Sequence, residues 1–379
     1  MHISAVNYKP YTYMTEQVSV VGGGIVGLTT AVFLELKGYD TRIYTKEVPY
    51  EDRRVPSLAT NYAAASVKPV VVDEDNTGEL TRVSDSFYEK LEPNTDTVVT
   101  QDNFEIHGYE EEEPDYADAL RGYRTLEEHG GVVPEPEEGV VSGWVHEIFF
   151  VEMPRYVPAL IDLYEREGGT VERRVVAKDE VGALSGEVVV NCTGYGNLFE
   201  DDAVVAKRGH LVEVETDGRL TDRNGESFSY SYYPHEGREG KTEEFVYAYP
   251  RDDCLLLGGS EQEGDEVDGE WVGEEDERSV STDGVDVPAR IVELNAELIE
   301  TKCGFDIRPR AKYGRVGYRP YRRGGIRLEK ETYDGKEVLH SYGHGGAGVT
   351  LSWYSANRVY NLISGSDGFD YSTLEDVEI

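Results

Sequence analysis

The sequence predicts an α/β fold in which a mostly parallel sheet with covering helices is joined to a region of antiparallel strands. Near the N-terminus, the β-branched run Val18-Ser19-Val20-Val21 leads through a glycine-rich turn into apolar residues at helical spacing. The apolar run 187–190 is typical of a buried parallel strand. The segments after residue 207 alternate as antiparallel strands do. Together these patterns give the fold class.

Length and charge limit what the protein can be. A single core stops growing at roughly 250 to 300 residues, so a chain of 379 residues is expected to form two domains. The formal net charge is −38, from 75 acidic and 37 basic residues. Such a surface repels nucleic acid and anionic membranes, so neither is expected as a partner. The acidic, lysine-poor composition predicts a halophilic archaeal source, and an acidic mesophilic protein is the alternative.

Cysteine spacing and hydropathy predict no disulfide framework, metal site or membrane span. Cys192, Cys254 and Cys303 are widely and irregularly spaced. No apolar run approaches the ~18 residues that cross a bilayer, and no signal-peptide pattern opens the chain. Residues 1–13 are polar and aperiodic, so they are expected to be a disordered extension, or Met14 is the true start. We expect a cytoplasmic protein, and a homodimer is one allowed assembly.

The first chemical motif is Gly22-x-Gly24-x-x-Gly27, placed between the strand 18–21 and the helical pattern 28–37. In this context the first glycine turns the chain, the second admits a pyrophosphate and the third lets helix and strand pack. Gly38 ends the helix and a strand restarts at 41–45. The motif therefore predicts a bound dinucleotide.

The residue that would hold the adenosine ribose is uncertain in this sequence. The dinucleotide motif needs an acidic residue at the end of the second strand, but the chain reads Tyr44-Thr45-Lys46-Glu47 there. Lys46 stands where the carboxylate would be, with Glu47 one place later. A basic residue at this place would suit a 2′-phosphate, which FAD lacks.

The middle of the chain contains weaker patterns. The small-residue run 57–66 predicts a loop or a helix start that a ring system could approach. Acidic and polar residues dominate 70–139, and the densest charge run, 109–114, is interpreted as a solvated loop. Further elements are expected as a short helix at 115–120, a strand at 144–151, a helix at 156–166 and a strand at 170–176.

Tyrosines concentrate in the antiparallel region. Strands are expected at 207–214, 245–250 and 255–259. The tyrosines of this region are either filler of amphipathic strands or the lining of an apolar pocket with hydroxyl groups pointing inward. They include Tyr230, Tyr232, Tyr233, Tyr247 and Tyr249.

Two C-terminal segments combine a fixed positive charge with a glycine loop. Gly317-Tyr318-Arg319-Pro320 offers a guanidinium that can bind a carboxylate through two parallel hydrogen bonds. About twenty residues later, 342–350 contains four glycines within six residues, which lets a ligand approach the backbone closely. Alone, the two segments are equally consistent with an ion pair and a turn.

Read together, these motifs resemble the D-amino-acid oxidase and D-aspartate oxidase family of FAD flavoproteins. The resemblance runs from about Val18 to the helix after Thr350. The specific segments are Asn191-Cys192-Thr193-Gly194, the G-x-R-P motif at 317–320 and the Y-G-H-G-G-x-G motif at 342–348; weaker ones are Gly143-Trp144-Val145-His146 and Arg208-Gly209-His210. The glycine fingerprint itself is shared with many other nucleotide-binding enzymes.

The resemblance implies a discontinuous Rossmann-like FAD-binding domain with an inserted, mixed antiparallel β-sheet substrate domain. The FAD-binding segments would be 14–72, 155–205 and 326–367, and the substrate-binding segments 73–154 and 206–325. It also implies which residues hold the cofactor: Gly22, Gly24, Ile25, Val26, Gly27, Lys46, Thr60, Ala63, Ala64, Val175, Thr193, Gly194, Arg319, Gly345, Gly346, Gly348, Val349 and Thr350.

For the reaction, the resemblance implies that Arg319 and Tyr247 bind the substrate carboxylate and that the Gly346 carbonyl accepts from the amine. Tyr230, Tyr232 or Tyr233 would supply a second pocket tyrosine. Hydride passes from the α-carbon to flavin N5, and O₂ reoxidation gives H₂O₂, a 2-oxo acid and ammonia. No side-chain base is needed, so positioning is the main catalytic contribution. The partners are then a D-amino acid and O₂.

Several alternatives remain open from the sequence. A glycine or sarcosine oxidase, or a dehydrogenase that passes electrons to another carrier, would use the same fold. A D-aspartate specialist needs a second cation, which Arg238, Arg322 or His235 could supply. Lys46 mildly favours an NAD(P) enzyme, and a non-enzymatic acidic binding protein is a further alternative. Neither alternative explains the 343–350 loop. The C-terminus lacks a peroxisomal signal, which agrees with a prokaryotic or archaeal cytoplasm.

Overall fold

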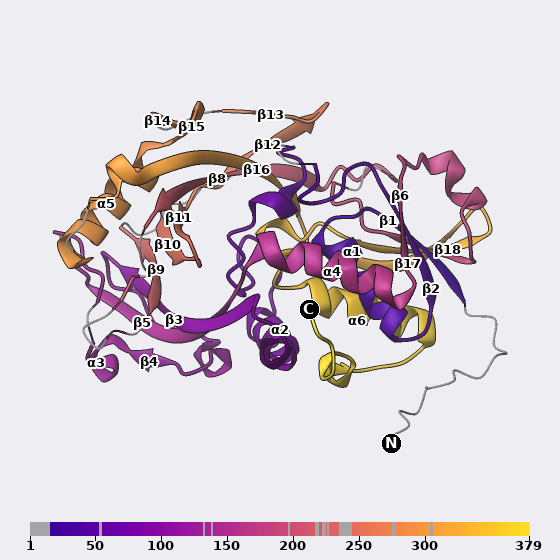
Figure 1. The fold of residues 1–379 in the computed structure, drawn as a ribbon, viewed down its shortest axis with the longest axis horizontal. Coiled ribbons are helices and arrows are strands. Elements are labelled where there is room, and N and C mark those ends of the chain that lie inside the picture. Colours follow the sequence, from indigo (N-terminus) through magenta and orange to yellow (C-terminus); the bar gives the residue numbers. More distant parts are fainter. Residues whose placement is uncertain are drawn as a thin grey trace, which may run out of the picture.

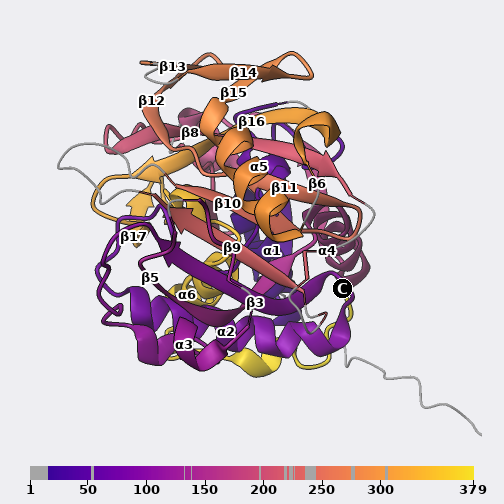
Figure 2. The ribbon, with the colours of Figure 1, turned by 90° about the vertical axis from the view of Figure 1, so that its left-hand side faces the viewer.

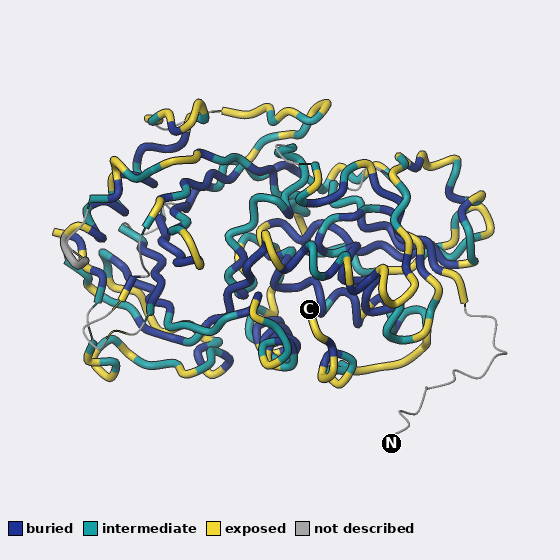
Figure 3. Tube along the Cα trace, in the orientation of Figure 1, coloured by how far each residue is buried: buried dark blue, intermediate teal, exposed yellow. Residues whose placement is uncertain are grey.

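The computed structural model divides into two lobes, one built on a parallel sheet and one on an antiparallel sheet (Figure 1). It describes residues 16–52, 55–131, 133–137, 139–195, 198–216, 220–221, 225, 227–234, 245–274, 278–303 and 306–379. Buried segments run through the middle of each lobe and exposed segments follow the periphery (Figure 3). The expected α/β class is confirmed.

The first lobe contains a six-stranded sheet. Its strand order is β17 (Arg327–Tyr333), β18 (Lys336–Tyr342), β7 (Val188–Asn191), β1 (Gln17–Val21), β2 (Asp40–Thr45) and β6 (Thr170–Arg173). All neighbours pair in parallel except the β17–β18 hairpin. Strands β1 and β7 are buried almost throughout because each has a neighbour on both sides and apolar cover.

Three helices form the apolar cover of this sheet. They are α1 (Ile25–Leu36), α4 (Met153–Glu167) and α6 (Ser352–Ser364), and α1 packs against both of the others. Trp353 of α6 is fully buried, and its indole N–H donates to the Tyr156 hydroxyl of α4 at 3.0 Å. The apolar side chains that recur at 3.6-residue spacing in these helices thus form one continuous core with the sheet.

The second lobe contains a ten-stranded sheet (Figure 2). In spatial order its strands are β13 (Glu270–Gly273), β12 (Gln262–Val267), β8 (Val204–Glu215), β11 (Cys254–Gly258), β10 (Val246–Pro250), β9 (Phe228–Tyr233), β3 (Val98–His107), β5 (Ser142–Val151) and β4 (Arg124–Thr125), with β16 (Ala311–Arg322) paired along β8. The β3–β9 pair is parallel, so the sheet is mixed. Helix α5 (Ala289–Cys303) packs on β10 and β11, beside the hairpin of β14 (Ser279–Thr282) and β15 (Val285–Pro288).

The remaining helical segments connect the sheets. They are η1 (Ala59–Tyr62), α2 (Thr77–Leu91), η2 (Glu92–Asn94), η3 (Ala117–Ala119), α3 (Leu126–His129), η4 (Lys178–Ala183), η5 (Arg308–Arg310), η6 (Gly345–Ala347) and η7 (Tyr371–Leu374). Helix α2 lies in the expected substrate-binding segment 73–154, yet it packs against α6 and η7 of the parallel-sheet lobe. Its buried Phe87 and Tyr88 belong to that lobe's core.

Most expected elements match the structure, and three differ. The acidic stretch 70–139 contains α2 and β3 as well as the exposed charge run 109–114. These two elements were missed because their apolar residues are too widely spaced to dominate the composition. The expected helix at 115–120 is the single turn η3. The strand expected at 170–176 ends at Arg173, and Val175 is 66% exposed. Within the described part of the chain, every helix is too short or too polar to cross a membrane.

Candidate active site

A cavity of about 970 Å³ is lined by residues of both sheets. This size lies at the upper end of small-molecule sites and suits a large ligand. Most of the residues that the sequence singled out line it: Gly22, Gly24, Ile25, Val26, Lys46, Thr60, Ala63, Ala64, Val175, Thr193, Gly194, Tyr233, Tyr247, Arg319, Gly346, Gly348 and Val349. Five others do not line it: Gly27, Tyr230, Tyr232, Gly345 and Thr350.

The glycine turn between β1 and α1 forms one end of the cavity. Gly22 has a φ of +111°, and a Cβ there would lie 2.3 Å from the Cys192 carbonyl oxygen of the neighbouring strand end. A Cβ on Gly27 would lie 2.0 Å from the Gly22 carbonyl oxygen. Only glycine therefore fits at these two positions, which bring the first turn of α1 against β1 and β7.

The start of α1 is fixed by a contact that the sequence did not reveal. The backbone N–H of Ile25 donates to the Thr60 hydroxyl at 2.9 Å, so η1 caps the helix N-terminus from outside. A helix N-terminus that opens on a cavity is suited to a phosphate group, because its N–H groups and dipole face outward. The fold thus presents a dinucleotide site, with small side chains at Ala63 and Ala64 along the adjoining wall.

Lys46 and Glu47 both line the cavity at the end of β2. The Lys46 ammonium lies 2.9 Å from the Glu47 carboxylate, and this hydrogen bond raises the pKa of Lys46. Lys46 has no acceptor atoms, whereas the Glu47 carboxylate can accept from ribose hydroxyls. Of these two residues, Glu47 is the one able to do the work of the acidic residue that the motif requires.

Arg319 of β16 supplies an uncompensated positive charge. Its Nη1 donates to the Ser260 carbonyl oxygen at 2.9 Å, and the described residues offer no carboxylate within ion-pairing distance of it. The guanidinium crosses Gly209 of β8, where a Cβ would lie 2.4 Å from Arg319 Cζ. Burial and the neighbouring arginines, Arg319 among them, lower the pKa of His210 to about 3, so this histidine adds no charge. The site can therefore receive an anion.

Tyr247 of β10 lies in a row of aromatic rings along the cavity wall. Its ring stacks on Tyr249 with centroids 4.2 Å apart, and Phe245 lies 6.2 Å away on the other side. Gly258 on the paired strand leaves room for its hydroxyl, since a Cβ there would lie 2.3 Å from that oxygen. Burial raises the pKa of Tyr247, although Arg319 opposes the rise, so the phenol stays protonated and can donate.

The register of β9 separates the three expected pocket tyrosines. Tyr233 lines the cavity and stacks on Phe245 with centroids 5.5 Å apart. Tyr230 and Tyr232 lie on the opposite face of the strand, in the core beneath α5, where the Tyr230 hydroxyl donates to Asn295 Oδ1 at 2.6 Å. Successive strand side chains point to opposite faces, so only one face of β9 can serve the cavity.

The C-terminal glycine loop packs against the segment 66–72. The Gly346 N–H donates to the Val71 carbonyl oxygen at 2.9 Å, and a Cβ on Gly345 would lie 2.1 Å from that same oxygen. The Thr350 hydroxyl donates to the Lys68 carbonyl oxygen at 3.0 Å. His344 Nε2 lies 2.7 Å from the Ser355 hydroxyl of α6. These contacts hold Gly346, Gly348 and Val349 at the cavity wall.

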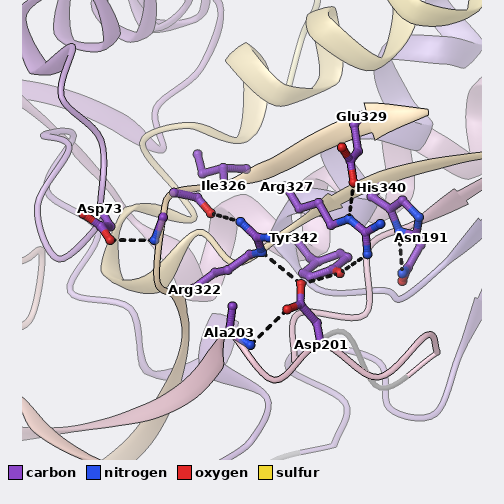
Figure 4. Close-up of polar contacts among 12 residues, drawn as sticks. Asp73, Asn191, Asp201, Ala203, Arg322, Ile326, Arg327, Glu329, His340 and Tyr342 are labelled. Atoms are coloured by element: carbon purple, nitrogen blue, oxygen red, sulfur yellow. Dashed lines mark hydrogen bonds and ion pairs between the residues drawn. The ribbon is translucent and has the colours of Figure 1, made fainter. Parts of the chain in front are cut away.

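A polar network anchors the strands beside this loop, and Figure 4 shows Asp201 between Arg322 and Tyr342. Arg322 Nε donates to Asp201 at 2.9 Å and its Nη1 to the Gly325 carbonyl oxygen at 3.1 Å. The Tyr342 hydroxyl donates to Asp201 at 2.8 Å and accepts from Arg327. Arg322 is therefore committed to Asp201 and does not line the cavity. The other two candidate second cations, His235 and Arg238, lie outside the described residues.

Two cavity residues went unnoticed in the sequence. Lys68 lines the wall opposite the aromatic row and pairs with the buried Glu105 of β3. Tyr195 follows the Thr193-Gly194 turn and is half-buried near Arg319. Neither residue lies in a motif. Lys68 and Glu105 are 37 residues apart, so no local pattern predicts their contact. The described residues include no cluster of histidine, cysteine and acidic side chains arranged to bind a metal ion.

Comparisons with known proteins agree with this geometry. A family model described as FAD dependent oxidoreductase matches residues 17–362. A D-amino-acid oxidase of Streptomyces coelicolor is 31% identical, covering 92% of this chain and 97% of its own. A D-aspartate oxidase of Talaromyces thermophilus is 27% identical, covering 92% of this chain and 95% of its own.

Among solved structures, a glycine oxidase from Geobacillus kaustophilus superposes with a TM-score of 0.64 at 18% identity. The match covers 96% of this chain and 100% of that chain. At this identity the similarity establishes the fold. The fold is thus shared with a protein of widely different sequence.

Proposed function

The chain belongs to the FAD dependent oxidoreductase family, and we propose that it catalyses the oxidative deamination of D-amino acids with O₂ as electron acceptor. The products are a 2-oxo acid, ammonia and hydrogen peroxide. One observation carries the choice of substrate. Arg319 lines the same cavity as the dinucleotide turn, and none of the described carboxylates pairs with it. An anionic group of the substrate would neutralise the positive charge of Arg319.

The residues that would hold FAD are those of the glycine turn and the C-terminal loop. Gly22 and Gly24 would face the pyrophosphate, and Glu47 the ribose. Gly346, Gly348 and Val349 would border the flavin ring. When bound there, FAD would supply the acceptor for the hydride of the substrate α-carbon, with O₂ as the final acceptor of the electrons. A Cβ at Gly22, Gly27 or Gly345 would meet a backbone oxygen of the protein itself, so these glycines let the turn and the loop pack tightly around the site.

The protein's own contribution is positioning. The Arg319 guanidinium binds the carboxylate with two parallel hydrogen bonds, and the Tyr247 hydroxyl donates a third. The backbone at Gly346 accepts from the amine. With the carboxylate and the amine both fixed, only one enantiomer directs its α-hydrogen toward the flavin. No side chain needs to remove a proton from the α-carbon, so orientation and exclusion of water supply the rate enhancement.

Oxygen as acceptor, a homodimeric state and a cytoplasmic location belong to this proposal. The D-amino-acid oxidase relative supports O₂, because its name states an oxidase. A dehydrogenase of the same fold would reduce an artificial acceptor but release no peroxide.

The test is a spectrum followed by a substrate panel. Purified protein is expected to be yellow, with flavin absorbance, and to release H₂O₂ with D-amino acids but not with their L-enantiomers. Glycine and sarcosine belong in the panel because an amine oxidase would prefer them. A colourless protein without recoverable flavin, or an enzyme selective for L-amino acids, contradicts the proposal.

A further inference from the structure

A half-buried lysine, Lys68, stands in the wall of the cavity near two of its tyrosines. The Lys68 side chain is 15% exposed, and its ammonium interacts electrostatically with Tyr233 and Tyr249. Both tyrosines line the same cavity. Lys68 is therefore placed where it can contact a substrate that Arg319 and Tyr247 hold by its carboxylate.

The backbone around Lys68 is fixed from both lobes. Its carbonyl oxygen accepts from the Thr350 hydroxyl at 3.0 Å and from the Val70 N–H at 2.9 Å. The preceding Val67 donates its N–H to the Phe149 carbonyl oxygen of β5 at 2.8 Å. The segment is thus bonded to the C-terminal glycine loop and to the ten-stranded sheet. This fixed backbone limits how far the ammonium can move when a ligand enters.

The charge of Lys68 is already neutralised by Glu105. The two side chains form an ion pair, and Glu105 is 6% exposed and does not line the cavity. Asn103 Nδ2 also donates to the Glu105 carboxylate at 2.8 Å, and His146 Nε2 lies 3.7 Å from it. Burial is the largest single effect and opposes both charges, but the neighbouring groups together outweigh it, so the pKa of Lys68 rises and the pKa of Glu105 falls. Both groups stay ionised near neutral pH.

The Lys68 ammonium keeps unused donors. An ammonium has three N–H groups, and within the described part of the chain only the bond to Glu105 engages one of them. Buried donors without acceptors are costly, so a ligand that supplies an acceptor is favoured over one that does not. A carboxylate there would leave the neutral pair with an excess negative charge in a poorly solvated site, which is disfavoured.

We propose that Lys68 selects D-amino acids whose side chain is uncharged and ends in a hydrogen-bond acceptor, with Glu105 excluding acidic side chains. This inference rests on the proposed function and names its substrate class. D-Glutamine, D-methionine and D-glutamate test it well, since the three side chains have similar length and differ in end-group chemistry. Wild-type enzyme then has its highest kcat/KM with D-glutamine.

Two variants are expected to move specificity in opposite directions. In the double variant Lys68→Met with Glu105→Gln, both charges disappear together, so no buried charge is left unpaired. Its D-glutamine to D-methionine ratio of kcat/KM falls by roughly 10- to 100-fold, the loss expected for one hydrogen bond to a charged donor. In Glu105→Gln, the unpaired ammonium raises the D-glutamate to D-glutamine ratio by about 10-fold or more.

The matched control removes another lysine–carboxylate pair, Lys37→Met with Asp370→Asn. Lys37 is 16% exposed, like Lys68, but its pair lies at the end of α1, away from the cavity. This variant keeps the wild-type ratios. Unchanged ratios in the Lys68 and Glu105 variants, or a wild-type preference for D-methionine or D-glutamate, overturn the assignment.

Failure of the proposed function is distinguishable from failure of this assignment. A wild-type protein that oxidises none of the three compounds contradicts the function. Calorimetric binding of the same compounds to the flavin-loaded protein without oxygen then tests Lys68 by itself. Binding of D-glutamine that weakens by the same factor in the double variant supports the assignment, and equal binding in both proteins contradicts it.

Discussion

The positions of two cavity side chains depend on glycines in the neighbouring strands. Arg319 can cross β8 because residue 209 is glycine, and Tyr247 reaches over β11 because residue 258 is glycine. Gly258 lies directly opposite Tyr247, whereas Gly209 pairs with Gly317, two residues before Arg319 on β16. The glycines at 209 and 258 therefore help to shape the cavity wall, because they leave room for Arg319 and Tyr247.

At this scale the proposal predicts the effect of Arg319→Lys. A lysine retains the charge but cannot form two parallel hydrogen bonds with a carboxylate, so KM is expected to rise about 100-fold with a smaller change in kcat. Steady-state peroxide release with the best D-amino acid measures it. Arg315→Lys is the control, since Arg315 lies on the same strand and pairs with Glu213. An unchanged KM for Arg319→Lys removes Arg319 from the carboxylate site.

At the scale of elements, the glycine loop is held by buried polar contacts. His344 precedes η6, is 3% exposed and bonds to Ser355 of α6. Burial lowers the pKa of His344 to about 3, because a charged imidazolium there would lose its hydration. The loop that borders the cavity is thus stable only while this histidine is neutral.

Stability is expected to depend on pH through His344. The unfolded chain protonates this histidine near pH 6.5, whereas the folded protein resists until about pH 3. Its contribution to the free energy of unfolding is complete above pH 6.5 and is lost as the pH falls, at about 1.4 kcal/mol per pH unit. His344→Gln is expected to flatten the slope by that amount between pH 6.5 and 5 in denaturant titrations. An identical slope in both proteins contradicts this account.

At the scale of the whole molecule, charge is the dominant property. With 75 acidic and 37 basic residues, self-repulsion opposes the compact state at low ionic strength. Many arginines and lysines are engaged with carboxylates at the surface, such as Arg173 with Glu51 and Asp52. These pairs leave most of the acidic excess uncompensated, so screening must come from solvent cations.

Salt is therefore expected to stabilise the fold, as the high-salt interpretation of the sequence requires. The thermal midpoint should rise by roughly 10 °C or more between dilute buffer and about 2 M KCl, because counterions screen the repulsion. Calorimetry or circular dichroism measures the midpoint, and an uncharged osmolyte of equal osmolality is the control. Equal stability in dilute buffer and in KCl contradicts adaptation to high salt.

The sequence determined the parts of this protein that depend on local chemistry. The strand–turn–helix with Gly22, Gly24 and Gly27 could be read directly, because the turn has no room for a Cβ at Gly22 and Gly27 and the flanking periodicities are strong. Arg319 and the 342–350 loop were singled out by residue type and spacing, but alone they were equally consistent with an ion pair and a turn, and their proposed roles came from the family resemblance. The two-sheet α/β class followed from these segments and from the buried run that became β7.

Tertiary structure decided what depends on register and on contacts between distant segments. Which tyrosine of β9 faces the cavity follows from its pairing with β3 and β10, and a shift of one residue would exchange Tyr233 for Tyr232. Helix α2 packs against α6 and η7 near the other end of the chain, so its place in the parallel-sheet lobe could not be read from the sequence. The pairing of Lys68 with Glu105 is a contact across 37 residues, which no local pattern encodes, and it places a neutralised charge at the cavity wall.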